Sequence, residues 1–215
     1  MKITQNIYYL LAYGLLLIAT LSACQKTDLP PSKTGDPRLF IRGTFKNKNV
    51  DLSIGNSSVT GTPEMKYVSE DSMNVPTFIF NIVDNQNPSG LSVKLSFVNY
   101  ASQFGVINNR DLDSTFKPGN KKIDNYFYNP ANPFRLNTCT FLVSDSTGNY
   151  SSRKFSPDNS YCVIDSVSDL VWFDHKTYKM IYLSFNVMMT STPFPDSTTF
   201  LPFSNGKAVI AFPKE

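Results

Sequence analysis

Catalysis by a charge-relay arrangement would depend on His175, because it is the only histidine in the chain. Such an arrangement needs a carboxylate that orients the imidazole from another part of the fold. Asp174 directly precedes His175 in a predicted hairpin turn, so it is a neighbour in sequence and not an orienting partner. A single histidine without a Cys-x-x-Cys pair also excludes the common zinc sites. We therefore expect His175 to be a solvated turn residue.

Two carboxylates could hydrolyse a glycan, since that chemistry needs only a pair of acids at a suitable separation. Among the few glutamates, Glu70 lies next to Asp71 in a predicted loop. Asp111 and Asp113 are spaced like calcium ligands, but the further acids and the glycine of a calcium loop are absent. Solvated loop acids are the better interpretation of both groups. The sequence therefore predicts no enzyme, no metal and no cofactor, with a carboxylate-dependent glycan hydrolase as the least favoured function.

A third chemistry is acylation of a thiol, and Cys24 lies where exported proteins carry that modification. It ends the run Leu21-Ser22-Ala23-Cys24, which follows an apolar segment beginning at Ile7. That segment has about 15 residues, whereas a helix that spans a bilayer needs roughly 20. Residues 1–23 closely resemble a bacterial lipoprotein signal peptide, in which small residues precede the cysteine. The resemblance implies removal of residues 1–23, then a diacylglyceryl thioether and an acylated amine at Cys24.

Lipidation would attach the chain to a membrane, because each buried methylene contributes about 0.8 kcal/mol and two or more chains bind stably. The next residues, Gln25-Lys26-Thr27-Asp28, resemble the tag of surface-exposed Bacteroidota lipoproteins. This implies the outer membrane, with the cell-surface face favoured over the periplasmic face. The proline-rich residues that follow predict a semi-extended tether over residues 24–37. An ordinary secretory signal with a chance cysteine is the alternative.

Cys139 and Cys162 remain once Cys24 is acylated, and an exported compartment permits a disulfide between them. They lie in strand-like runs at residues 136–144 and 160–167. If these runs pair antiparallel, the sulfurs could meet, and the bridge would stabilise the fold by about 3 kcal/mol in the loop-entropy model. Two separate buried thiols, which behave as small hydrophobic groups, are the alternative.

Alternation of apolar and polar residues predicts strands through most of the chain after the tether. Residues 91–100 alternate most clearly, which indicates one buried and one wet face. Asn205-Gly206 has the signal of a tight hairpin. Other strands are predicted at residues 38–46, 50–54, 65–69, 76–83, 136–144, 160–167, 178–190, 197–202 and 208–212. The pattern predicts a single all-β domain over residues 38–215, an antiparallel β-sandwich or flattened barrel of about 9–10 strands with long loops.

The longest predicted irregular segment is residues 101–133, and a loop of that length in a compact domain often carries function. Aromatic faces stack on sugars or contact proteins, so rings in and just after this segment could face a ligand. The alternative is that they attach the loop to the core. The candidate ligand-facing residues are Tyr126, Phe127, Tyr128 and Phe134.

The chain resembles the small β-sandwich lipoproteins of Bacteroidota, which include domain families of unknown function. The resemblance depends on the signal peptide, on Gly43-Thr44-Phe45 with its following hairpin, and on a closing pattern of short motifs. The motifs of that pattern are Ser160-Tyr161, Leu183-Ser184-Phe185 and Asn205-Gly206-Lys207. They mark strands and turns, so the resemblance implies fold and location and no catalytic residue.

The pattern Asp-Ser-Thr occurs at residues 113–115, 145–147 and 196–198. It resembles the O-glycosylation signal of exported Bacteroidota proteins, which implies a glycan on Ser114, Ser146 and Ser197. The alternative is turn chemistry, because Asp and Ser side chains bond to nearby backbone amides.

Charge excludes one class of partner. The formal net charge is +3, and loss of Lys2 with the signal peptide leaves +2, which is too near neutral for a nucleic-acid surface. We expect a non-catalytic binding or accessory lipoprotein with a membrane anchor and a glycan or protein partner. The alternative is a structural or assembly subunit of fimbrial type, trimmed after Arg38 or Arg42 to accept a donated strand.

Overall fold

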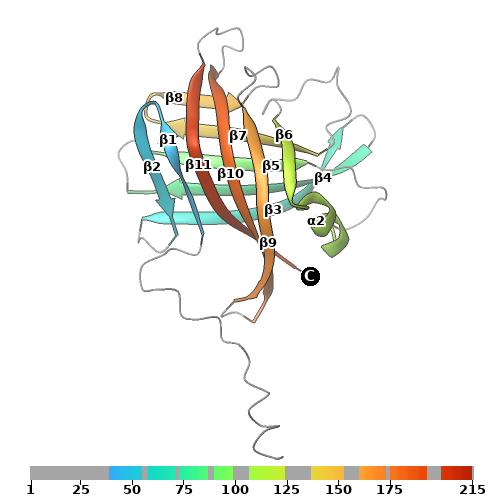
Figure 1. Ribbon diagram of the computed structural model, residues 1–215. Coiled ribbons are helices and arrows are strands. Elements are labelled where there is room, and N and C mark those ends of the chain that lie inside the picture. Colours follow the sequence, from blue (N-terminus) through green and yellow to red (C-terminus); the bar gives the residue numbers. More distant parts are fainter. Residues whose placement is uncertain are drawn as a thin grey trace, which may run out of the picture. The chain divides into compact units, whose positions relative to one another are not determined.

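The computed structural model describes residues 39–54, 58–70, 73–86, 90–98, 107–123, 137–152, 160–172, 175–192 and 200–214. They belong to a compact unit, Pro37–Glu215, with its own hydrophobic core. The elements are β1 (Phe40–Phe45), β2 (Lys48–Ser53), β3 (Val59–Glu70), β4 (Met73–Asp84), β5 (Ser92–Val98), α2 (Asn109–Thr115), β6 (Gly119–Ile123), β7 (Thr138–Asp145), β8 (Gly148–Ser152), β9 (Tyr161–Val171), β10 (Thr177–Thr192) and β11 (Leu201–Pro213) (Figure 1).

The eleven described strands form one continuous sheet that folds over on itself. Its path is β2-β1-β11-β10-β9-β6-β7-β5-β4-β3, and β8 pairs with both β10 and β7. We call β2, β1, β11, β10 and β9 the front layer, and β7, β5, β4 and β3 the back layer. In Figure 1 the long strands of the front layer run across those of the back layer. Each described pairing is antiparallel except that of β6 with β7. The predicted all-β sandwich or flattened barrel is confirmed.

The core lies between the two layers and is rich in phenylalanine. Alternation along each strand sends one set of side chains inward, as the sequence of β5 predicted. The ring of Phe185 in β10 lies 4.9 Å from that of Phe141 in β7 and 5.0 Å from that of Phe203 in β11. Offset and edge contacts of this kind add to the free energy of burying the rings. Phe185 therefore joins both layers.

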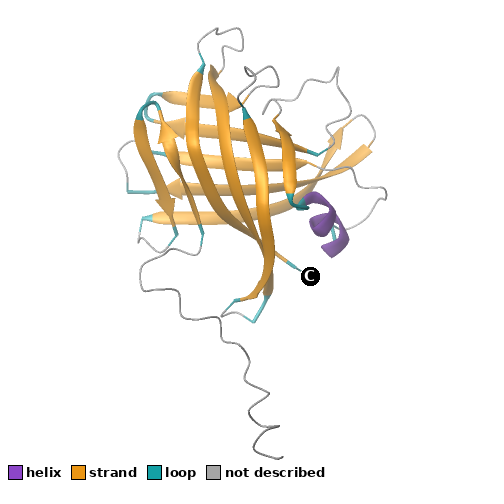
Figure 2. Cartoon of the chain, viewed as in Figure 1, coloured by secondary structure: helices purple, strands orange, loops and turns teal. Residues whose placement is uncertain are grey.

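The short helix α2 lies in the segment that the sequence predicted to be irregular (Figure 2). Asn108 caps it by accepting from the backbone amides of Arg110 and Asp111, and Asp111 bonds back to the amide of Asn108. Phe116, directly after the helix, stacks on Phe212 of β11 at 5.2 Å. Seven residues are too few for a visible helical stripe, so only the capping signal marks this helix in the sequence.

The predicted hairpin at Asn205-Gly206 is wrong, because β11 continues through both residues. Asn205 has a φ of 53°, and the pairing of β11 shifts register against β1 and against β10 at this point. The Asn-Gly signal therefore marks a bulge inside a central strand, where an extra residue is left out of the ladder. The strands β6 and β8, which lie in predicted loops, bring the number of described strands above the expected 9–10.

Candidate functional site

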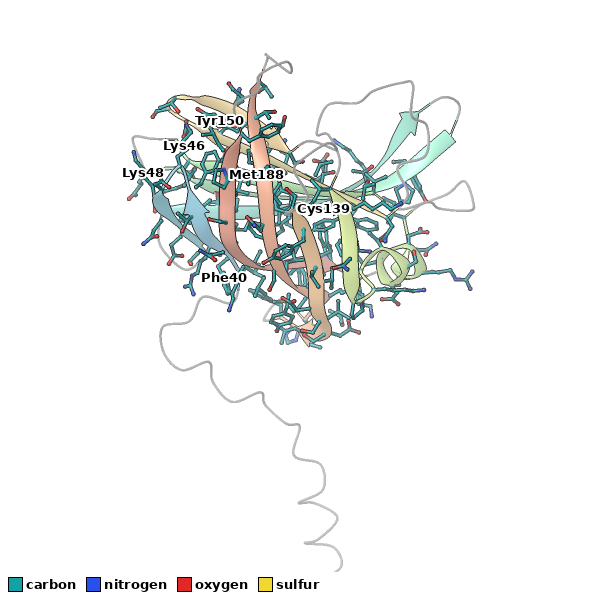
Figure 3. The ribbon with its side chains drawn as sticks, turned by 45° about the horizontal axis from the view of Figure 1, so that its top comes forward. Phe40, Lys46, Lys48, Cys139, Tyr150 and Met188 are labelled. Atoms are coloured by element: carbon teal, nitrogen blue, oxygen red, sulfur yellow. The ribbon has the colours of Figure 1, made fainter. Side chains whose placement is uncertain are left out.

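Lys46 joins the front layer to the back layer through a cluster of polar side chains. It lies in the β1–β2 turn, where Lys46 and Asn47 have φ values of 51° and 60°. The Nζ of Lys46 donates to Asp145 Oδ2 at 2.9 Å, to Thr147 Oγ1 at 2.6 Å and to the hydroxyl of Tyr150. These acceptors belong to the β7–β8 hairpin, and Figure 3 shows Lys46 beside Tyr150. We call Lys46, Asp145, Thr147 and Tyr150 the Lys46 latch.

The Lys46 latch is partly shielded from water, with side-chain exposures of 23% for Lys46 and 15% for Asp145. Burial opposes the charge on Lys46, but its bonds to Tyr150 and Asp145 outweigh burial and raise its pKa. Burial likewise opposes the charge on Asp145, but bonds from Thr147 and Lys46 outweigh it and lower the pKa of that carboxyl. A protonated amine bound to three acceptors is a poor nucleophile. The latch is therefore suited to holding two turns together.

A second group of charges surrounds Lys179, near the start of β10. Lys179 is 7% exposed, and its Nζ lies 2.7 Å from Asp113 of α2 and 3.8 Å from Asp169 of β9. Asp169 also accepts from Lys214 at 2.7 Å, and this bond is the main cause that lowers the pKa of Asp169. The network holds α2 and the C-terminal residues against the β9–β10 hairpin. Asp113, considered above as a calcium ligand, pairs here with a lysine.

Cys139 of β7 and Cys162 of β9 lie beside each other, and both are fully buried thiols. The sequence analysis considered direct antiparallel pairing of their strands. In the structure the two strands do not pair with each other. Both strands pair with β6, where Ile123 is opposite Cys139 and Lys121 is opposite Cys162. A hydrogen bond links the two thiols. The expected proximity of the sulfurs therefore arises across an intervening strand.

The amine of Lys121 lies close to these thiols and is itself buried, with 7% exposure for the residue. It donates to the carbonyl oxygen of Thr115 at 2.5 Å and to the side-chain oxygen of Asn137. Burial lowers the pKa of Lys121. Burial also raises the pKa of the Cys139 thiol well above its usual value, and the hydrogen bond to Cys162 adds to this effect. An activated cysteine needs access and a lowered pKa, so this thiol–lysine cluster is not arranged as a nucleophile.

The outer face of the front layer carries a second apolar cluster, separate from the core between the layers. Met180, Val209 and Ala211 are 3%, 7% and 3% exposed, although they alternate with residues that point into the core. Tyr182, opposite Val209, is 38% exposed, and Val171 at the end of β9 is 63% exposed. The outer apolar band consists of Met180, Val209 and Ala211 with the partly buried Leu39, Phe40, Leu170, Trp172 and Tyr178.

Of the residues considered for catalysis, Asp71 and Asp174 lie outside the described residues, and Glu70 is described only as the last residue of β3. His175 is exposed in the β9–β10 turn with a φ of 62°. Glu64 lies on β3 and forms an exposed ion pair with Lys66 at 2.9 Å. Among the described residues, no group of three or more His, Cys, Asp and Glu side chains lies together to hold a metal ion.

The predicted modification sites have different environments. Ser146 is exposed in the β7–β8 turn, between two residues of the Lys46 latch. Ser114 is half-buried in α2, and its hydroxyl donates to the carbonyl oxygen of Asp111 at 3.0 Å. Ser197 and the lipidation site Cys24 lie outside the described residues.

The four aromatic residues predicted to face a ligand also lie outside the described residues, but the ends of their segment are fixed. Residues 124–137 follow the last residue of β6 and precede the first residue of β7. These strands are parallel neighbours, with Lys122 opposite Thr138 and Ile123 opposite Cys139. The segment therefore leaves and re-enters the sheet on adjacent strands. Its aromatic residues are Tyr126, Phe127, Tyr128 and Phe134.

The sequence analysis did not identify Lys46, Lys121 or the outer apolar band. Lys46 and Asp145 are 99 positions apart, so no local pattern connects them. Lys121 lies beside an exposed lysine, Lys122, so its neighbourhood in the sequence does not indicate burial. A signal for the band existed in the alternating Tyr178, Met180 and Tyr182, which make the outer face of β10 partly apolar.

Comparison of the chain with protein-family models, curated proteins and solved structures finds no match. In the part of the chain that the structure describes, no helix is long and apolar enough to span a bilayer.

Proposed function

We propose that this chain is an outer-membrane lipoprotein that acts at the cell surface as a non-catalytic binding or accessory module. The observation that carries the proposal is Cys24 at the end of the run Leu21-Ser22-Ala23-Cys24, after an apolar segment too short to span a bilayer. The described β domain supports a role as a stable, displayed body. Its buried amines, those of Lys121 and Lys179, bond to groups of the fold itself.

Binding is assigned to the segment of residues 124–137. Both of its ends are held on adjacent parallel strands, which gives a long loop a rigid base. Four aromatic residues within 14 positions offer flat faces to a glycan or to apolar side chains of a protein. The partner is therefore expected to be a sugar polymer or a surface protein, recognised by stacking.

Protease treatment of intact cells tests the surface location. The proposal predicts that an external protease removes the domain while a periplasmic protein in the same cells survives. If the domain is protected until the outer membrane is opened, its location is the periplasmic face.

A glycan array and pull-down with the mature protein test the binding segment. Replacing both Tyr126 and Tyr128 by Ala should abolish capture of the partner. Tyr161→Ala is the matched control, because Tyr161 is 46% exposed on β9, outside the segment. Equal capture by the double variant would contradict the assignment, and cleavage of a captured glycan would contradict the non-catalytic role.

The second candidate is a fimbrial-type subunit, favoured by the two ends of the sheet path. Strands β2 and β3 each have one described neighbour, so each leaves an edge to which a donated strand could add. Trimming after Arg42 does not suit this role, because Arg42 lies inside β1 and pairs with both Asp51 and Lys207. Arg38 precedes β1 and remains the candidate site. A ladder of heat-sensitive multimers on a gel would favour this function over the first.

A further inference from the structure

The front layer brings three parts of the domain to one end. Strands β1, β11 and β10 are antiparallel neighbours, so β1 begins where β11 ends and where β10 begins. Phe40 is opposite Val209, and Pro213 is opposite Tyr178. The β9–β10 turn therefore lies at the same end as the start of β1, at the lower end of the domain in Figure 1. The tether enters the domain at this end, because residues 24–38 lead directly into β1.

This end carries apolar and aromatic side chains on its outer face. Trp172 packs against Tyr178 with ring centroids 5.7 Å apart, and both belong to the outer apolar band. Val171, directly before Trp172, is 63% exposed at the end of β9. Tryptophan and tyrosine are enriched at membrane–water interfaces, where one part of the ring system is apolar and the other is hydrated.

The charges around the band are suited to lipid headgroups. Lys176 is exposed in the turn next to Trp172. The carboxylate of Asp169 on the same hairpin is paired with Lys214 at 2.7 Å, so its charge is balanced. Farther along the band, the Arg42 guanidinium lies 4.5 Å from the ring centre of Phe40 and pairs with Asp51 at 3.1 Å. An apolar tip with cationic neighbours is the usual composition of an interfacial contact.

The length of the tether keeps this end near the anchor. The 15 peptide steps from Cys24 to Leu39 span at most about 50 Å when fully extended. A domain held by so short a chain meets the bilayer repeatedly, at a high effective concentration. We infer that the tip of the outer apolar band, formed by Trp172 and Tyr178, rests in the headgroup layer of the membrane that holds Cys24, together with the exposed Val171 at the end of β9. The inference depends on the proposed lipid anchor and adds an orientation to it, with the opposite end and the Lys46 latch facing away from the lipid.

Trp172 can report on this contact directly, because it is the only tryptophan of the chain. The lipidated protein is reconstituted in vesicles of phosphatidylethanolamine and phosphatidylglycerol, with or without brominated acyl chains. The expected result is that the vesicles carry the protein on flotation, and that brominated lipid quenches Trp172 emission and shifts its remaining maximum. Flotation without quenching would overturn the inference and leave the anchor intact. Absence of flotation would overturn the anchor, and the inference with it.

Two variants distinguish lipid contact from a general effect. Val171→Asp places a charge at the tip and should reduce quenching while flotation persists. Tyr161→Asp changes an exposed aromatic residue at the other end of the same strand and should leave quenching unchanged. Equal quenching in Val171→Asp and the parent protein would overturn the inference. Sedimentation before vesicles are added tests for a dimer. A dimer that already shields Trp172 from a water-soluble quencher would also overturn the inference.

Discussion

The ring of Phe185 occupies the space that a side chain on Gly206 would need. A Cβ built on Gly206 would lie 2.2 Å from ring carbon Cε2 of Phe185. The bulge at Asn205, with its φ of 53°, brings the glycine under the ring. Because Phe185 also contacts Phe141 of the back layer, this close approach sets how the front layer packs on the back layer.

Gly206→Ala should lower the free energy of unfolding by about 3 kcal/mol, since overpacking of a filled core forces the ring or the strand to move. Urea denaturation of the mature protein measures the loss. Lys207→Ala, at the adjacent exposed position, should change stability by less than about 0.5 kcal/mol. Similar stabilities of Gly206→Ala and the parent would mean that the bulge is not tightly packed.

The sequence predicted β5 and β10 well, because the alternation of apolar and polar residues is visible along both strands. It did not predict β6 and β8, which have five residues each, or the seven-residue helix α2. The Asn-Gly signal was misread for another reason. Positive φ at Asn205 is needed by a bulge as well as by a hairpin turn, and only the pairing of β11 on both sides decides between them.

Lys46→Met should destabilise the fold by about 2 kcal/mol, the usual scale for losing hydrogen bonds to a charged group. The variant keeps the aliphatic part of the side chain and leaves Asp145 without its ammonium partner. Thermal and urea unfolding measure the change. Lys48→Met is the matched control, since Lys48 is exposed in the same hairpin (Figure 3).

The Lys46 latch should also give the protein a pH-dependent stability. Burial would raise the pKa of Asp145, but bonds from Thr147 and Lys46 hold it below 3.8, so its contribution is complete above about pH 5 and is lost as the pH falls through the lowered value. The pKa of Lys46 is raised above 10.5, so its contribution is complete below that pH and is lost in stronger base. Lys46→Met should flatten the stability profile below pH 4, and an unchanged slope would contradict this account.

The proposed export implies an oxidising compartment, where the chain should contain a Cys139–Cys162 disulfide, because the two thiols are hydrogen-bonded neighbours. Intact mass should rise by two hydrogens on reduction after unfolding, and reduction should cost about 3 kcal/mol of stability. In protein kept reduced, both thiols should resist alkylation until denatured, because neither is exposed. Two thiols titrated in unreduced, denatured protein would contradict the bridge.

Ser146 should carry a glycan in the native host. It is exposed at the tip of a turn whose neighbours Asp145 and Thr147 are held by the Lys46 latch, so a transferase meets a rigid acceptor. Ser146→Ala should lower the intact mass by more than the mass of the oxygen atom that the substitution removes. A triple variant that adds Ser114→Ala and Ser197→Ala would reveal further sites. Equal masses after correction for the substitutions would exclude the modification.

The candidate sites show where sequence reasoning fails. The sequence analysis considered direct pairing of the strands of Cys139 and Cys162 as one way for the sulfurs to meet, whereas β6 lies between these strands. The Lys46 latch joins two turns that are distant in the chain, and neither turn contains a motif that names its partner. Contacts made by the folding of one layer over another follow from topology, which local periodicity does not encode.

Labelling cells with radioactive palmitate tests the central claim most directly. The account predicts that label enters the chain, and that Cys24→Ala abolishes it while Cys139→Ala and Cys162→Ala do not. Label absent from the parent chain, or retained in Cys24→Ala, would contradict lipid attachment at Cys24 and the location proposed from it.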